Sequence, residues 1–149
     1  RPRFSRRQIG LARELGILIE SAQLRIAQAA DAERIALYWA IGERLRRHFP
    51  SERNQSAIAD HLAAQFGPQF RAERLLLMMQ LSEKYPIREM GPSLMRKLTW
   101  SHFIQLIRIE GPSKRKFYTD RCRVEQLSVG ALRKEINAGV YERRVGGCP

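Results

Sequence analysis

The sequence predicts an all-α protein of seven or eight helices, and three observations support this fold class. Apolar residues recur at three- and four-residue steps through most of the 149-residue chain, which is the spacing of one helix face. Gly-Pro pairs at 67–68, 91–92 and 111–112 divide the chain into segments of helical length. No stretch alternates apolar and polar residues as a half-buried strand does.

The first predicted element covers residues 8–49. Its apolar side chains form one stripe at helical spacing, made of Leu11, Leu15, Leu18, Ala22 and Ile26. Asp31 can cap a second helix, so the segment is either one long helix or a helical hairpin. Pro50 disfavours helical backbone at the residue before it and therefore ends the element.

Two shorter helices are predicted next, at residues 57–66 and 71–84. Ser56 can cap the first helix, the Gly-Pro pair at 67–68 stops it, and the second helix ends before Pro86. A short apolar helix, a brief break and a second helix that opens with arginines have the pattern of a helix-turn-helix.

Three further helices are predicted toward the C-terminus. Thr99 can cap the first, Pro112 can occupy the first turn of the second, and Ser128 can cap the third. We divide the chain into residues 1–50, a basic arm plus the long helix or hairpin, and residues 51–149, a bundle that contains the helix-turn-helix. Together they are expected to form one structural domain.

The charge balance predicts a polyanionic partner. The chain has 27 Lys+Arg against 15 Asp+Glu, a formal net charge of +12. Nucleic acid is the first candidate, an anionic membrane surface is the second, and plain solubility is the alternative explanation. No apolar run approaches the roughly 20 residues that a bilayer span needs, so no membrane partner is expected.

Cysteine and histidine usage predicts neither a metal site nor a disulfide framework. The two cysteines are Cys122 and Cys148. The sequence separations between these cysteines and the three histidines do not match those of a zinc site. We therefore expect no metal and no cofactor, and a reducing, cytoplasmic location.

The helix predicted at residues 71–84 is the candidate recognition helix. Its core stripe is expected at Ala72, Leu75, Leu76 and Met79. Arg71 and Arg74 are the candidate base contacts, because the N-terminal end of a recognition helix enters the major groove and arginine pairs with guanine. Gln80 and Lys84 are expected to reach phosphates. The alternative is an ordinary buried helix pair, because residues 75–79 are all apolar.

Two other basic clusters are candidates for phosphate contacts. The first is the N-terminal arm, with Arg3, Arg6 and Arg7, and the second is Lys114, Arg115 and Lys116. An arm of this kind can enter a minor groove or follow phosphates, but it can equally be a solvated terminus. The second cluster opens a helix, where cations oppose the dipole and a phosphate would offset them. Surface charge without function is its alternative.

No constellation in the sequence predicts catalysis. His102 follows Ser101 directly, and neighbours on a helix do not face each other, so a capping or core role is expected for the histidine. The aspartates are Asp31, Asp60 and Asp120, and none belongs to a metal-nuclease pattern. The chain is therefore expected not to be an enzyme.

Five strings occur in a distinctive order. They are YWAIG at 38–42, LTWSH at 98–102, KFY at 116–118, LSV at 127–129 and YER at 141–143. This order and spacing resembles the N-terminal helical domain of the YhcG family of bacterial-type nucleases. The resemblance covers about residues 11–143 and is more specific than a helix-turn-helix pattern alone.

The resemblance implies a DNA-binding helical module that precedes a PD-(D/E)xK nuclease domain. It implies the targeting half of a nuclease, with the nuclease domain as a partner in cis or in trans and absent from this chain. Leu127 stands where the family tends to have Trp, and residues 71–74 replace its Ser-x-Arg-Asn pattern. A weaker similarity to ParB-type partition proteins supports only the placement of the helix-turn-helix.

Together these observations predict a non-catalytic, helix-turn-helix module that binds duplex DNA and targets or regulates a nuclease. RNA remains an alternative target, because charge does not distinguish the two nucleic acids. The main alternative function is an oligomerisation or protein-docking domain, with homo-oligomers formed through the long apolar stripe of the first element.

Overall fold

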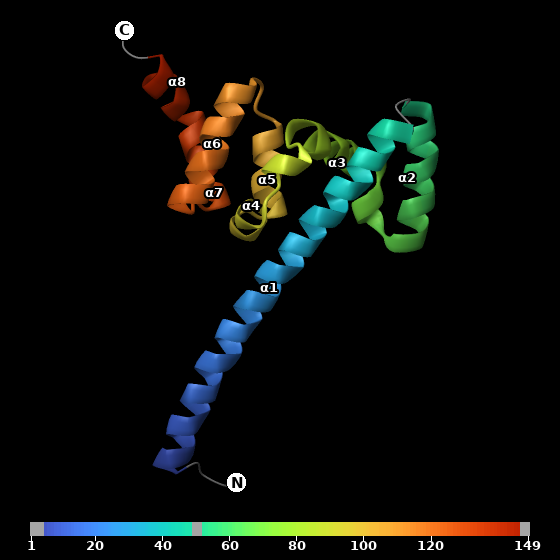
Figure 1. Ribbon diagram of the computed structural model, residues 1–149. Coiled ribbons are helices and arrows are strands. Elements are labelled where there is room, and N and C mark those ends of the chain that lie inside the picture. The colour runs from blue at the N-terminus through green and yellow to red at the C-terminus, as the bar shows by residue number, and fades with distance from the viewer. Residues whose placement is uncertain (1–4, 49–51, 147–149) are drawn as a thin grey trace.

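The computed structural model of the protein describes residues 5–48 and 52–146. Within these residues it contains eight α-helices, two short 3-10 turns and no strand, which confirms the all-α prediction (Figure 1). The elements are α1 (Arg6–His48), α2 (Glu52–Phe66), η1 (Pro68–Phe70), α3 (Ala72–Lys84), η2 (Ile87–Glu89), α4 (Pro92–Lys97), α5 (Trp100–Ile107), α6 (Pro112–Glu125), α7 (Val129–Asn137) and α8 (Val140–Val145).

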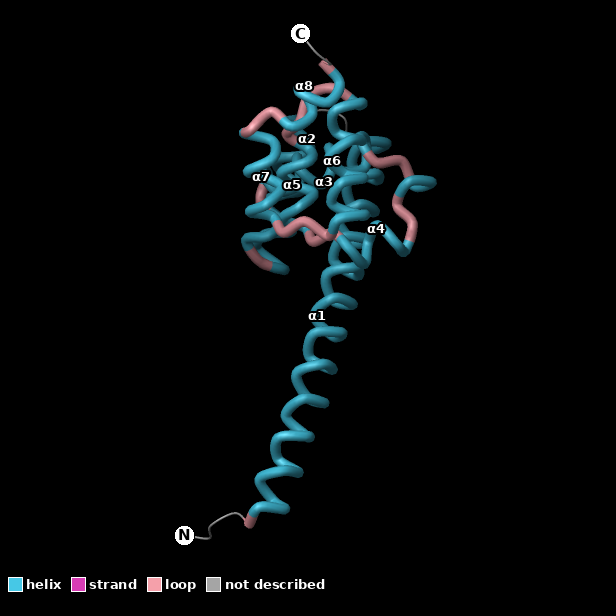
Figure 2. The backbone as a smooth tube through the Cα atoms, turned by 90° about the vertical axis from the view of Figure 1, so that its left-hand side faces the viewer, coloured by secondary structure: helices cyan, strands magenta, loops and turns pink. Residues whose placement is uncertain are grey.

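The first element is one continuous helix and not a hairpin. α1 has 43 residues, so it is about 65 Å long at 1.5 Å per residue. Asp31 does not cap a second helix but pairs with Arg34 at 2.9 Å. The buried residues of α1 all lie in its C-terminal third, from Ile35 to Leu45. The N-terminal part projects away from the other helices, as both views show (Figures 1 and 2).

The C-terminal part of α1 packs most closely on α3, and Gly42 makes this possible. A Cβ atom added at Gly42 would overlap the carbonyl group of Met78, so the two helix backbones touch at this point. A glycine inside a helix costs about 1 kcal/mol relative to alanine, and here the cost is offset by the close packing that it allows.

This crossing fixes which face of α3 is buried. The buried residues are Leu75, Met78, Leu81 and Ser82. The predicted stripe was wrong in part, because Leu76 is 51% exposed and Ala72 is also exposed, while Met79 is half-buried. With a run of five apolar residues, spacing alone could not select the face, and the contact with α1 selects the side that carries Met78.

Aromatic residues extend the core from α1 to the later helices. The indole Nε1 of Trp39 donates to the carbonyl oxygen of Tyr85 at 2.7 Å, which satisfies a carbonyl at the C-terminal end of α3. Tyr38 contacts Trp100 edge to face, with ring centroids 5.0 Å apart. Tyr85 meets Phe103 of α5 in the same geometry at 5.2 Å. α1, α3 and α5 therefore share one core.

The predicted capping role of His102 is confirmed. Thr99 Oγ1 accepts the backbone N–H of His102, and His102 Nδ1 accepts the backbone N–H of Thr99 at 3.0 Å, which completes a capping box at the start of α5. The same ring bonds through Nε2 to the carbonyl oxygen of Leu127 at 2.7 Å. Because Nδ1 accepts, Nε2 is the donor. His102 thus joins α5 to the loop before α7.

Other predicted boundaries had mixed outcomes. Thr99 and Ser128 are N-caps and Pro112 opens α6, as predicted. Ser56 is not a cap, because α2 already begins at Glu52. No described helix has both the length and the apolar character needed to cross a bilayer.

Replacing Gly42 by alanine should lower the free energy of unfolding by about 1–3 kcal/mol, because the new methyl group forces α1 away from α3. Gly16→Ala is the matched control: this helical glycine has no atom within 4 Å of an added Cβ, so the change should leave stability unchanged or raise it. Urea denaturation followed by circular dichroism measures both. Equal stability of the two variants would contradict the close crossing.

Candidate nucleic-acid interface

A cleft of about 440 Å³ lies between the end of α3, the segment that contains η2 and α4, and α6. It is lined by Lys84, Tyr85, Arg88, Glu89, Gly91, Ser93, Leu94, Pro112, Arg115, Lys116, Thr119, Asp120 and Arg123. Five of these residues are cationic and two are acidic. We call this the basic cleft.

Two of the cations in the basic cleft are held by backbone carbonyl groups. Lys84 Nζ donates to the carbonyl oxygen of Ile107 at 2.7 Å, and an Arg115 guanidinium nitrogen donates to that of Ile109 at 2.8 Å. Ile107 is the last residue of α5, whose last carbonyls favour positive charge, and Ile109 lies two residues beyond it. A neutral carbonyl fixes the position of each cation without neutralising it.

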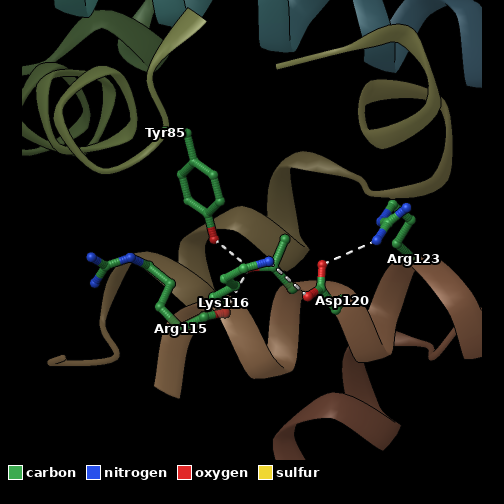
Figure 3. A network of polar contacts seen from close by, with 6 residues as sticks. Tyr85, Arg115, Lys116, Asp120 and Arg123 are labelled. Atoms are coloured by element: carbon green, nitrogen blue, oxygen red, sulfur yellow. Dashed lines mark hydrogen bonds and ion pairs between the residues drawn. The ribbon is translucent and has the colours of Figure 1, made fainter. Parts of the chain in front are cut away.

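A buried hydrogen-bond chain supports the inner side of the basic cleft. Thr119 Oγ1 donates to the carbonyl oxygen of Arg115 at 2.7 Å and accepts from the Tyr85 hydroxyl at 2.8 Å (Figure 3). Burial raises the pKa of the Tyr85 hydroxyl well above its ordinary value, so the phenol stays neutral and acts as the donor. The chain ties the end of α3 to the middle of α6.

The rim of the basic cleft carries its more exposed charges. Lys116 and Arg123 each lie 3.2 Å from an oxygen of Asp120 (Figure 3). Along α6, Lys116 lies one turn before Asp120 and Arg123 one turn after it. The side chains in these two ion pairs are at least 42% exposed, so each ion pair contributes little free energy. Arg88 makes no hydrogen bond or ion pair with the described residues. Three cations at the rim are thus available to an incoming anion.

The start of α6 adds a further feature that suits an anion. Gly111 is its N-cap, with a φ of 94° and no side-chain capping bond, and Pro112 at the first position lines the basic cleft. The uncapped N–H groups of a helix N-terminus, together with the dipole, favour negative charge. Pro112 has no N–H to donate, so this helix end adds a favourable dipole to the cleft, and the cationic side chains supply the contacts to a phosphate group.

The structure brings together three of the predicted contact residues. Lys84, Arg115 and Lys116 all line the basic cleft. Lys114 lies outside its lining and pairs with Glu142 of α8 at 2.7 Å, which raises the pKa of Lys114 and lowers that of Glu142. Arg6 opens α1, on the part of that helix that projects away from the other elements (Figure 1).

Two further predicted residues of the N-terminal arm have different outcomes. Arg7 is exposed beside the first residue of α1, whereas Arg3 lies outside the described residues. Sequence reasoning missed Arg88 and Arg123 as site residues, and both line the basic cleft. For Arg88 the available signal was the density of cations around the Gly-Pro pair at 91–92.

The candidate recognition helix has a divided surface. Arg71 is the N-cap of α3 and Arg74 lies in its first turn; both are exposed and line a second hollow together with Arg34 of α1. Glu73 lies between these arginines and lines the same hollow. Farther along α3, Gln80 is half-buried and Glu83 is exposed. The cations of α3 therefore lie at its two ends, with Arg71 and Arg74 at the N-terminal end and Lys84 in the basic cleft.

Comparison with known families identifies this chain. The model of the DUF1016 N-terminal domain matches residues 14–143, and the chain therefore belongs to that family. This is the N-terminal domain of the YhcG type that the sequence strings resemble; the ParB-type similarity found no such support. No curated protein and no solved structure matches the chain.

Cys122 should be inert toward alkylating reagents at neutral and mildly alkaline pH. Burial, followed by the charge of Glu135, raises the pKa of this thiol to about 12, so the reactive thiolate is nearly absent at neutral and mildly alkaline pH. Iodoacetamide labelling with peptide mapping should show labelling of Cys122 only after unfolding by urea. Rapid labelling of Cys122 in the native protein would contradict its burial in α6.

Proposed function

We propose that this member of the DUF1016 N-terminal domain family is a non-catalytic module that binds duplex DNA mainly through its phosphates. The observation that carries the proposal is the basic cleft, whose lining includes five cationic side chains and two carboxylates. Phosphate contacts supply most of the affinity of non-specific DNA binding and a large share of specific binding. The net charge of +12 adds long-range attraction.

The cation arrangement favours a phosphate backbone over a small anion. Arg115 and Lys84 are anchored deep in the basic cleft, while Lys116 and Arg123 stand along the rim, seven residues or two turns apart on α6. Successive turns of one helix therefore offer separate donors, as a repeating polyanion requires.

We propose that base contacts are made by the N-terminal end of α3, the recognition helix predicted from the sequence. Arg71 and Arg74 stand at the exposed N-terminal end of α3, where the second helix of a helix-turn-helix meets the major groove. α2, η1 and α3 supply the helix, break and helix of that motif. In this arrangement the basic cleft positions the module and α3 reads the sequence.

The biological role follows from the family. We propose that the module delivers or regulates a nuclease domain, in cis or in trans. Among the described residues no group of three His, Cys, Asp or Glu side chains could hold a metal ion. A module that supplies binding without chemistry is consistent with that division of labour. A protein-docking domain is the alternative, and failure to bind DNA at low salt would favour it.

Removing two rim cations should weaken DNA binding. The double change Arg88→Gln with Lys116→Gln should raise the Kd for duplex DNA about tenfold or more and reduce the slope of log K against log salt by about 1–2. Fluorescence anisotropy across a salt series measures both quantities. Neither residue is buried, so the variant should keep its fold.

The control for this experiment removes the same charge elsewhere. Arg13→Gln combined with Arg133→Gln takes two exposed cations from outside the basic cleft, one from the projecting part of α1 and one from α7. This control should change the Kd much less than the variant of the basic cleft. Equal weakening by both pairs would mean that net charge alone drives binding and would contradict a specific site.

Arg71→Ala should relax sequence preference. Loss of a bidentate base contact costs about 1–3 kcal/mol for the preferred site and little for other sequences. Selection from a random duplex library, followed by competition assays, measures the preference before and after the change. Lys114→Ala is the comparison, because Lys114 is already paired with Glu142. Unchanged preference in Arg71→Ala, with weaker binding in Lys114→Ala, would place the contact face elsewhere.

A further inference from the structure

The projecting part of α1 carries an apolar face that no described residue covers. Burial on this helix begins only in its C-terminal third, and Ile35 is its first fully buried residue. The earlier residues include aliphatic side chains that are 47–68% exposed: Leu11, Leu15, Leu18, Ile19 and Ile26. With Ala22 they define the α1 stripe. Exposed apolar surface of this extent marks a site of interaction in most proteins.

The α1 stripe is separate from the face that α1 uses for its own core. At 3.6 residues per turn, Leu11, Leu15 and Ala22 lie within a narrow sector of the helix. Tyr38 and Gly42 lie on roughly the opposite side, toward α3. The stripe is therefore not a continuation of the core, and α3 cannot cover it.

We propose that a second copy of this chain covers the α1 stripe, in an antiparallel, two-fold symmetric pair of α1 helices. The spacing supports a helical partner: Leu11, Leu15, Leu18 and Ala22 follow the alternating steps of four and three that place residues at the seam of a coiled coil. The next two seam positions are Arg25 and Ala29.

The charge in the seam decides the orientation. A parallel pair would place Arg25 directly against its own copy in the buried seam, which costs free energy because like charges repel. An antiparallel pair places Arg25 opposite the partner's Leu15 and within reach of the partner's Glu14. The two-fold axis repeats this contact on both sides of the pair.

Side-chain size supports the same register. When Leu15 faces Arg25, the seam also pairs Leu18 with the partner's Ala22 and Leu11 with the partner's Ala29. In these two pairs a large residue meets a small one, which is how two packed helices fill the space between them. The interface is self-complementary and closes as a dimer, because each helix offers the same surface to the other.

Sedimentation equilibrium of the whole chain without DNA tests the proposal. The wild type should be a dimer at micromolar concentration, and Leu18→Glu should raise the dimer dissociation constant at least about tenfold. Ile17→Glu is the matched control, because Ile17 is 62% exposed and Leu18 63%, but Ile17 lies outside the stripe. This control should change the constant by less than about threefold.

A charge exchange tests the orientation. Arg25→Glu should weaken the dimer, because the new carboxylate faces the partner's Glu14, and adding Glu14→Arg should restore it. Failure of the double variant to recover would overturn the antiparallel register.

A wild type that stays monomeric at hundreds of micromolar, or equal weakening by Leu18→Glu and Ile17→Glu, would overturn the dimer itself. Leu18 is exposed and distant from the core, so its variant should fold, which circular dichroism checks. Because DNA is absent from the assay, its outcome is independent of the proposed DNA binding.

Discussion

The close crossing of α1 and α3 at Gly42 is the constraint on which the rest of the fold depends. Without a side chain at Gly42, the backbone of α1 reaches the carbonyl of Met78, and this contact fixes the rotation of α3. The end of α3 then lies where Trp39 can bond to the Tyr85 carbonyl. The Tyr85 hydroxyl in turn bonds to Thr119 of α6. The crossing of α1 and α3 therefore determines the position of the wall of the basic cleft.

The strings that carry the family resemblance prove to be determinants of packing. YWAIG supplies the aromatic contacts and the glycine of the crossing, and LTWSH supplies the capping box of α5 and the bond to the Leu127 carbonyl. Such contacts need particular residue types, because a buried donor or a backbone approach tolerates few substitutes. The family signature therefore mainly specifies the scaffold, and of the proposed DNA contacts it includes Lys116 of the KFY string.

The molecule separates its charged and apolar surfaces. The cations of the basic cleft gather where α3, α4 and α6 meet, and the α1 stripe projects away from these helices (Figures 1 and 2). A dimer through α1 would hold two clefts at a distance set by a stiff helix of about 65 Å. Two weak phosphate sites on one particle bind a long polyanion more tightly than either alone, because the second contact is intramolecular.

The sequence by itself determined the fold class, the caps at Thr99 and Ser128, the role of His102 and the cationic character of the surface, because these depend on local spacing and residue type. Only the tertiary structure decided that α1 is continuous and that Met78, in place of Leu76, faces the core. It also brought Arg88 and Arg123 together with Lys84. These outcomes depend on contacts between residues distant in sequence, which periodicity along one segment does not contain.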